Sequence, residues 1–203
     1  MRVLENKLKV TMKQKRIIIG ITGATGFIYG VRLLELLADT EYETHLILSK
    51  AAHQTRAYES SLSAADVTKL ADKHYPANDI AACLSSGSYQ TLGMIIAPCS
   101  MRTLADIANG TTGNLLSRAA DVVLKERRKL VLMIRETPLH CGHIENMLKV
   151  SQMGAIVAPP VPAFYNAPQS VDDIVNHSVG RVLDLFDIDS SIVKRWNPKT
   201  KIC

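Results

Sequence analysis

The stretch IIIGITGATG at residues 17–26 decides the fold of this chain. Its first six residues form an apolar, mostly β-branched run, which is typical of a strand buried on both faces of a sheet. Gly20, Gly23 and Gly26 lie at three-residue spacing and lead into an amphipathic segment at 27–38. A glycine-rich turn before a helix lets the backbone approach a phosphate, and the helix N-terminus offers unpaired N–H groups. The stretch therefore predicts a strand–turn–helix unit suited to a phosphorylated ligand.

The same alternation of apolar runs and helical patterns continues along the chain. Four further short runs are typical of buried strands, at 44–49, 94–98, 130–134 and 155–159. Helical patterns lie between or after them, at 114–128, 143–153 and 171–186. This order predicts a single doubly wound α/β domain, Rossmann-like (flavodoxin-like), with a mainly parallel sheet. Ligands of such folds bind beyond the carboxyl ends of the strands, so we expect the loops there to carry the site.

The net charge of +5 is concentrated at the N-terminus. Residues 1–16 hold six of the 24 bases and one of the 19 acids, so the rest of the chain carries 18 of each. A protein that binds nucleic acid needs a basic surface on its folded body, and this body has no overall excess of bases. We therefore predict a basic leader over residues 1–15, a domain over residues 16–203, and no nucleic-acid partner.

Membrane and metal binding find no support in the sequence. The leader lacks the apolar region of a secretory signal, and no apolar run approaches the roughly 20 residues of a membrane span. The four cysteines form no C-x-x-C pair, which favours free thiols in a cytoplasmic protein. His140, Cys141 and His143 lie within one turn and have no distant fourth ligand, so we expect no metal.

The glycine-rich turn has two interpretations. The spacing G-x-x-G-x-x-G is also typical of nicotinamide-dependent short-chain dehydrogenases, but none of the six tyrosines is followed four residues later by the lysine that those enzymes need. Ser49 and Lys50 also stand where an acid would hold the ribose diol. The alternative is a mononucleotide pocket, in which Ser49, Ser100 and Thr103 offer hydroxyls just beyond strand ends. Those hydroxyls are equally suited to capping helices.

Eight stretches bear on this choice, and they run in one order over nearly the whole chain: TGATG (22–26), LSKAA (48–52), SSGS (85–88), IIAPCSMRTLA (95–105), NLLSRAADVVLKERRKLVLMIRETP (114–138), HIENML (143–148), PAFYNAPQSVDDIV (162–175) and KRWN (194–197). Together they resemble the flavin prenyltransferases of the UbiX/Pad type. The resemblance implies a flavoprotein that binds reduced FMN and dimethylallyl monophosphate. It implies prenyl transfer to N5 and C6 of the flavin without a metal, giving prenylated FMN for a UbiD-type decarboxylase. It further implies a homo-oligomer, a dodecamer with sites at subunit junctions.

The resemblance also assigns residues to the flavin site. Those implied to bind FMN are Gly23, Ala24, Thr25, Ser49, Ser100, Met101, Arg102, Thr103 and Arg135. Position 25 is commonly Ser in the family, so Thr25 keeps the hydroxyl and adds a methyl group to the pocket.

A second implied group would bind the phosphate of the prenyl donor: Arg118, Lys125, Tyr165 and Arg181. A dianionic leaving group needs cations close by as its C–O bond breaks. Arg118 and Lys125 are seven residues apart and so lie two turns apart on one helix face. Without the resemblance, that face would be solvated, with Asp121 pairing with Lys125.

The residues implied to act in catalysis are Glu136, Trp196, Thr25, Glu59 and Lys125. Glu136 follows a strand end, where a carboxylate can move a proton at the flavin. The indole of Trp196 can stabilise an allylic cation, although an aromatic residue there can also simply pin the C-terminal tail. A non-catalytic FMN-binding subunit of an aromatic acid decarboxylase is the second hypothesis, and an NAD(P)-dependent dehydrogenase is the third.

Overall fold

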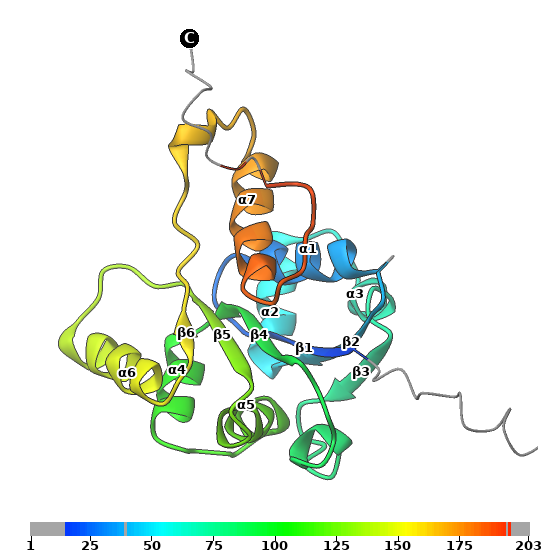
Figure 1. Ribbon diagram of the computed structural model, residues 1–203, viewed down its shortest axis with the longest axis vertical. Helices are drawn as coiled ribbons and strands as arrows, with labels where there is room; N and C mark the ends of the chain where they lie inside the picture. Colours follow the sequence, from blue (N-terminus) through cyan, green and yellow to red (C-terminus); the bar gives the residue numbers. More distant parts are fainter. Residues whose placement is uncertain (1–14, 39, 194, 196–203) are drawn as a thin grey trace, which may run out of the picture.

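The computed structural model of this chain describes residues 15–38, 40–193 and 195, and within them six parallel strands form one sheet (Figure 1). The strands follow the order β3-β2-β1-β4-β5-β6, which is the strand order of the Rossmann fold. Their bounds are β1 Lys15–Ile21, β2 Tyr42–Leu48, β3 Lys73–Pro76, β4 Gly93–Cys99, β5 Lys129–Ile134 and β6 Ile156–Val157. The predicted doubly wound, Rossmann-like sheet is therefore confirmed.

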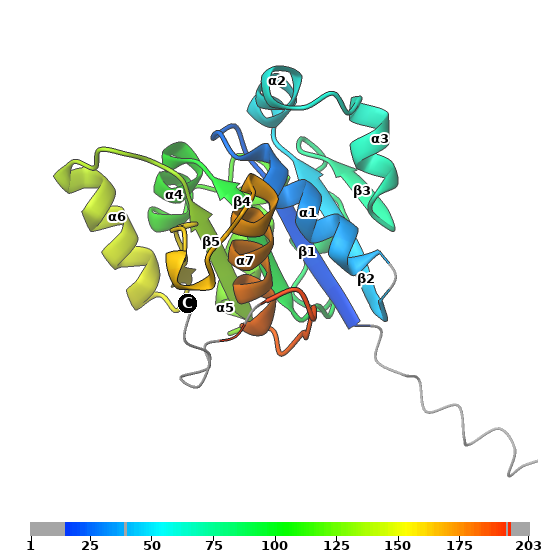
Figure 2. The same ribbon diagram turned by 90° about the horizontal axis from the view of Figure 1, so that it is seen from above.

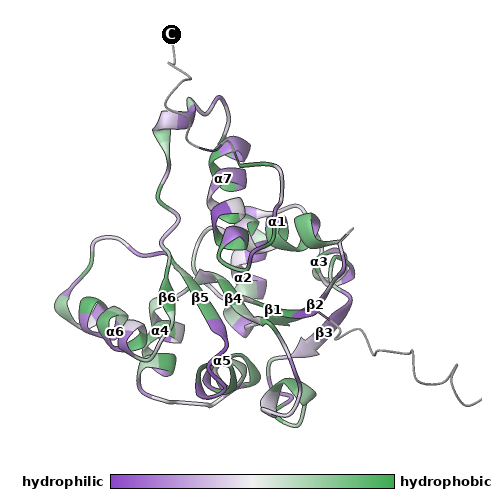
Figure 3. Cartoon of the chain, viewed as in Figure 1, coloured by the Kyte–Doolittle hydropathy of each residue, from purple (hydrophilic) through white to green (hydrophobic). Residues whose placement is uncertain are grey.

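Helices cover both faces of the sheet. They are α1 Phe27–Leu37, α2 Lys50–Glu59, α3 Ala64–Lys69, α4 Met101–Ala108, α5 Leu115–Lys125, α6 Cys141–Gln152 and α7 Val171–Asp184, with short 3₁₀ turns η2 Cys83–Ser85 and η3 Phe164–Asn166. Helices α1 and α7 pack side by side over one face, while α4, α5 and α6 lie on the other (Figures 1 and 2). The helices in Figure 3 alternate hydrophobic and hydrophilic residues along their length, as amphipathic helices do.

The apolar run that opens β1 fills two cores at once. Ile17, Ile19 and Ile21 are buried under α1 and α7, whereas Ile18 points into the core beneath α5. Side chains of a strand alternate between faces, so only a continuous apolar run serves a sheet covered on both sides.

The structure also shows what the sequence pattern missed. Strand β3 and helices α2, α3 and α4 were not predicted. Strand β3 has the sequence KHYP, lies at the edge of the sheet and is mostly exposed, so it lacks the apolar run by which the other strands were predicted. The first strand begins at Lys15, and residues 1–14 of the predicted leader lie outside the described residues.

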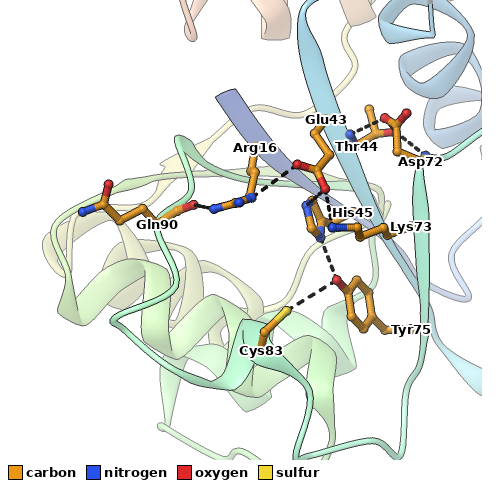
Figure 4. Close-up of polar contacts among 9 residues, drawn as sticks. All are labelled: Arg16, Glu43, Thr44, His45, Asp72, Lys73, Tyr75, Cys83 and Gln90. Carbon is orange, nitrogen blue, oxygen red and sulfur yellow. Dashed lines mark hydrogen bonds and ion pairs between the residues drawn. The ribbon is translucent and has the colours of Figure 1, made fainter. Parts of the chain in front are cut away.

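A polar cluster joins the three strands β1, β2 and β3 near their amino ends, on the α5 face (Figure 4). His45 is fully buried there, with its Nδ1 2.9 Å from the Tyr75 hydroxyl and its Nε2 3.5 Å from Oε1 of Glu43. Glu43 also pairs with Arg16 and Lys73. Burial lowers the pKa of His45 to about 4, so the imidazole is neutral at pH 7.

Candidate active site

The carboxyl ends of β1, β4 and β5 are linked into one edge. The hydroxyl of Thr22, after β1, donates to the carbonyl of Pro98 at 2.7 Å and accepts the backbone N–H of Ser100 at 2.8 Å. The N–H of Arg135, after β5, donates to the carbonyl of Cys99 at 3.2 Å. Chains leaving β1 and β4 turn to opposite faces of the sheet, which opens the crevice where ligands of this fold bind. The predicted flavin residues thus gather around this edge.

The loop at 22–26 is held tightly against α2. The hydroxyl of Thr55 donates to the carbonyl of Gly23 at 3.1 Å. A Cβ atom at Gly23 would lie only 2.4 Å from the Cβ of Ala51, so any other residue would push the loop away from α2. Glycine is therefore required at position 23 by this close approach, and Ala24 and Thr25 follow it on the exposed side of the loop.

The hydroxyls predicted for the pocket also cap helices. Ser49 accepts the N–H of Ala52 at 3.1 Å at the start of α2. Ser100 accepts the N–H of Thr103 at 3.3 Å at the start of α4 and donates to the Thr103 hydroxyl at 3.1 Å. The capping interpretation is thus confirmed, and it fixes the N-termini of two helices beside the crevice. Met101 and Arg102 occupy the first turn of α4, with Arg102 exposed.

Glu59 closes the N-terminus of α1. Its Oε2 accepts the backbone N–H groups of Gly26 at 2.8 Å and Phe27 at 2.9 Å. Partial burial alone would raise the pKa of Glu59, but hydrogen bonds from Thr25, Phe27 and Gly26 and the charge of Arg135 hold that pKa below its ordinary value. The unpaired N–H groups expected from the sequence at this turn are therefore paired with a carboxylate of the chain itself. This differs from Rossmann dehydrogenases, in which a helix N-terminus at this position receives the cofactor pyrophosphate.

Arg135 and Glu136 follow directly on β5, and both side chains are exposed. Glu136 accepts the N–H of Thr137 at 3.0 Å through Oε1, which leaves Oε2 for another partner. Arg135 acts on Tyr29 of α1, a residue that sequence reasoning missed. Burial raises the pKa of the half-buried Tyr29, and the Arg135 charge opposes that rise.

Helix α5 carries Arg118 and Lys125, two of the four residues predicted to bind the phosphate of the prenyl donor. Arg118 pairs with Asp121 at 2.6 Å, while Lys125 pairs with Glu126. The pairing of Asp121 with Lys125 considered from the sequence is therefore wrong, because Arg118 one turn earlier takes that carboxylate. Lys125 also lies close to Gly87, in the SSGS stretch.

The other two predicted phosphate-binding residues, Tyr165 and Arg181, lie beside or on α7. The hydroxyl of Tyr165 is 3.1 Å from Nε2 of His177, and Arg181 follows one turn later and pairs with Asp184. A groove of about 230 Å³ runs between residues 158–161 and α7, with His177 and Arg181 in its lining. Burial and the nearby Arg181 charge lower the pKa of His177.

These two pairs of predicted phosphate-binding residues lie on opposite faces of the sheet, since α5 packs on one face and α7 on the other (Figure 1). One copy of the chain therefore does not bring Arg118 and Lys125 together with Tyr165 and Arg181. Trp196 lies outside the described residues.

Over the described parts of the chain, no group of three or more His, Cys, Asp and Glu residues is arranged to hold a metal ion. The rings of His140 and His143 pack against each other, 3.6 Å between centroids, at the start of α6.

No described helix is long and apolar enough to span a membrane.

Known proteins resemble this chain over most of its length. The family model described as Flavoprotein matches residues 5–183. The flavin prenyltransferase UbiX of Escherichia coli (strain K12) is 56% identical over 185 residues, covering 90% of this chain and 98% of that protein. The crystal structure of AnUbiX (PadA1) with FMN and dimethylallyl pyrophosphate has a TM-score of 0.91 and 49% identity, covering 93% of this chain and 100% of the other.

A second solved structure adds an assembly. The dodecameric FMN-dependent UbiX-like decarboxylase from Escherichia coli O157:H7 has a TM-score of 0.88 and 53% identity, covering 90% of this chain and 99% of the other. With this level of identity across nearly complete chains, the protein belongs to the flavoprotein family and, within it, to the UbiX-type flavin prenyltransferases.

Proposed function

We propose that this protein transfers the dimethylallyl group of dimethylallyl monophosphate to N5 and C6 of reduced FMN, with release of phosphate. The observation that carries the proposal is the match, over nearly all of both chains, to a UbiX structure that holds FMN and dimethylallyl pyrophosphate. The crevice beside Ser49, Ser100 and Arg135 supports it, because capped helix N-termini and a guanidinium suit a phosphorylated flavin.

The flavin would lie against the loop at 22–26 and the first turn of α4. Backbone N–H groups and the Thr103 hydroxyl would hold its polar edges, and Met101 would cover part of its ring. Arg135 would supply positive charge from β5. Glu59 would keep the loop in place, with its carboxylate held ionised by the hydrogen bonds from residues 25–27.

Prenyl transfer begins with breakage of the donor's C–O bond, whose electron pair leaves with the phosphate. Arg118, Lys125 and Arg181 would stabilise the growing negative charge, and the Tyr165 hydroxyl would donate to it. The allylic cation left behind is best stabilised by an aromatic face, which is the role we propose for Trp196. The cation then bonds to N5 of the flavin, which releases the proton that N5 carried.

For the second bond, the proton released from N5 adds to the prenyl double bond, C6 attacks the tertiary cation that results, and C6 then loses its own proton. Glu136 is the group we propose to accept it, because it stands at the end of β5 with one carboxylate oxygen still available beyond the bond to Thr137. An exposed carboxylate also returns the proton to solvent without a relay.

We further propose that the site is completed by a second copy of the chain. Arg118 and Lys125 lie on the opposite face of the sheet from Tyr165 and Arg181, so a single phosphate is reached by all four only across a subunit boundary. A homo-oligomer, most simply a dodecamer like the UbiX-like decarboxylase structure, provides such boundaries.

The product has a defined use in this proposal. Prenylated FMN would pass to a UbiD-type decarboxylase as its cofactor. We place the protein in the cytoplasm, which agrees with the free thiols of Cys83, Cys99 and Cys141.

Phosphate release tests the proposal against its alternatives. Purified protein is incubated without oxygen with dimethylallyl monophosphate, with and without reduced FMN, and free phosphate is measured. Release is expected only when both compounds are present. In Glu136→Gln it is expected to stop after a single turnover, because the first bond still forms and the second does not, whereas Glu145→Gln, which changes an exposed acid on α6, should turn over normally. Tight FMN binding without phosphate release would instead support the non-catalytic subunit. Saturable NAD(P)H binding without FMN binding would support the dehydrogenase.

A further inference from the structure

One carboxylate near the end of α7 binds two guanidinium groups at once. Asp184 accepts from Nη1 of Arg181, and it accepts from both terminal nitrogens of Arg195, at 2.9 and 3.0 Å. The Asp184 side chain is only 14% exposed, whereas the two arginines are more than half exposed. The Arg195 hydrogen bonds, more strongly than those of Arg181, hold the pKa of Asp184 below its ordinary value, so the carboxylate is ionised at pH 7.

The same end of the chain packs closely on α7 at a second point. A Cβ atom at Gly180 would lie 2.2 Å from Cγ2 of Val193 and 3.1 Å from Oγ of Ser190. The segment at 190–193 therefore crosses α7 where the helix has no side chain. Gly180 and Asp184 are one turn apart, so the close packing and the ion pair together fix both the position and the direction of the segment.

This arrangement connects two residues of the proposed chemistry. Arg181 is one of the proposed phosphate ligands, and Arg195 directly precedes Trp196, the only tryptophan of the chain. Asp184 therefore contacts both a proposed phosphate ligand and the residue that precedes the proposed cation-stabilising tryptophan. Two arginines and one aspartate retain one net positive charge, so the cluster still attracts a phosphate.

Resting on the function proposed above, we infer that Asp184 is a positioning residue for prenyl transfer. It holds the Arg181 guanidinium ready for the substrate phosphate, and it anchors Arg195, the residue before Trp196 in the sequence, at the end of α7. Ordering long arginine side chains before substrate binds removes an entropy cost that binding would otherwise carry. The two other acidic residues nearby do not replace it, because Asp187 pairs with Lys129, and Asp189 reaches Arg195 only at 3.6 Å.

The single tryptophan gives this inference its own readout. Fluorescence quenching by acrylamide reports on Trp196 alone in the full-length protein. Asp184→Asn is expected to raise the quenching constant at least twofold and to lower kcat/KM for dimethylallyl monophosphate about tenfold, since a charge-assisted pair is lost. FMN binding is expected to stay within about twofold, because Asp184 lies on α7, away from the crevice.

Two further variants separate positioning from folding. Arg195→Gln changes an exposed side chain and is expected to reproduce the quenching and kinetic changes, while the double variant adds less than about twofold to either single variant. Asp187→Asn, the matched control, is expected to behave like the unaltered protein.

Unchanged quenching and kinetics in Asp184→Asn would overturn the inference, and so would full additivity in the double variant. Failure of the proposed function has a different signature. There the unaltered protein forms no prenylated FMN, while the quenching comparison still reports whether Asp184 and Arg195 fix Trp196.

Discussion

Oε2 of Glu59 lies 2.8 Å from the backbone nitrogen of Gly26, although 33 residues separate them in the chain. The bond places the end of α2 against the start of α1 and occupies the N–H groups that a dinucleotide would need. Glu59 thus sets the shape of the crevice and also distinguishes this site from that of a Rossmann dehydrogenase.

Replacing Glu59 with alanine is expected to cost about 1 kcal/mol of unfolding free energy, because the N-terminus of α1 loses its cap. The pKa of Glu59 lies below its ordinary value, so the stabilisation is present at neutral pH and is lost as the pH falls through the pKa of the folded state. Urea unfolding at pH 7 and pH 4 measures both effects. Glu35→Ala, which removes an exposed pair with Arg32, serves as the control and should cost less than about 0.5 kcal/mol.

Gly23→Ala is expected to weaken FMN binding about tenfold or more, since the new methyl group would lie 2.4 Å from the Cβ of Ala51. A flavin fluorescence titration measures the change. Adding the second substitution Ala51→Gly should restore part of the affinity, because it removes the Cβ atom with which the new methyl group collides. Gly113→Ala, which meets nothing within 4 Å, should bind FMN normally. Equal affinity for Gly23→Ala and Gly113→Ala would contradict the close packing of the loop.

The protein is expected to lose folding stability at acid pH because of His45. Its pKa falls from 6.5 to about 4 on burial, so the unfolded chain binds a proton in this range that the folded chain does not. Stability should therefore fall as the pH is lowered from about 6.5 to 4, by about 3 kcal/mol. Unfolding midpoints of His45→Gln across this range should show a shallower pH slope than those of the unaltered protein. An unchanged slope would show that other groups are responsible, and His53→Gln, an exposed histidine, controls for the substitution itself.

Subunit mixing tests whether the phosphate site crosses a subunit boundary. Arg118→Ala and Arg181→Ala are each expected to lose most activity, because each removes a cation from the same site. When the two variants are unfolded, mixed in equal amounts and refolded, random assembly restores both arginines in about a quarter of the sites. Activity near that fraction supports a shared site. No recovery, in assemblies shown to contain both variants, would mean that each chain builds its site alone.

The sequence predicted the sheet wherever burial left a continuous apolar run, as in IIIGIT and MIIAP. It did not predict β3, whose sequence KHYP lies at an exposed edge and so needs no such run. Local patterns also do not identify partners across the chain. The bond from Gly26 to Glu59 and the choice of Asp121 to pair with Arg118 depend on how side chains meet after folding.

The functional residues likewise include some that the sequence predicted and others that depend on contacts made only after folding. Ser49, Ser100 and Thr103 were predicted because the fold places loops beyond the strand ends, whereas Arg135 was assigned only by the family resemblance. The separation of Arg118 from Arg181 by the sheet was not predicted, since it depends on which face each helix covers. Tyr29 and Asp184 carried no sequence signal at all, because only their contacts with Arg135 and Arg195 set them apart.

The mass of the flavin after turnover shows whether the protein adds a prenyl group to FMN. The protein is incubated without oxygen with reduced FMN and dimethylallyl monophosphate, and the released flavin is analysed by mass spectrometry. A gain of about 68 Da, one C5H8 unit, is expected with the unaltered protein and with Asp187→Asn. Flavin of unchanged mass from protein that binds FMN would contradict it.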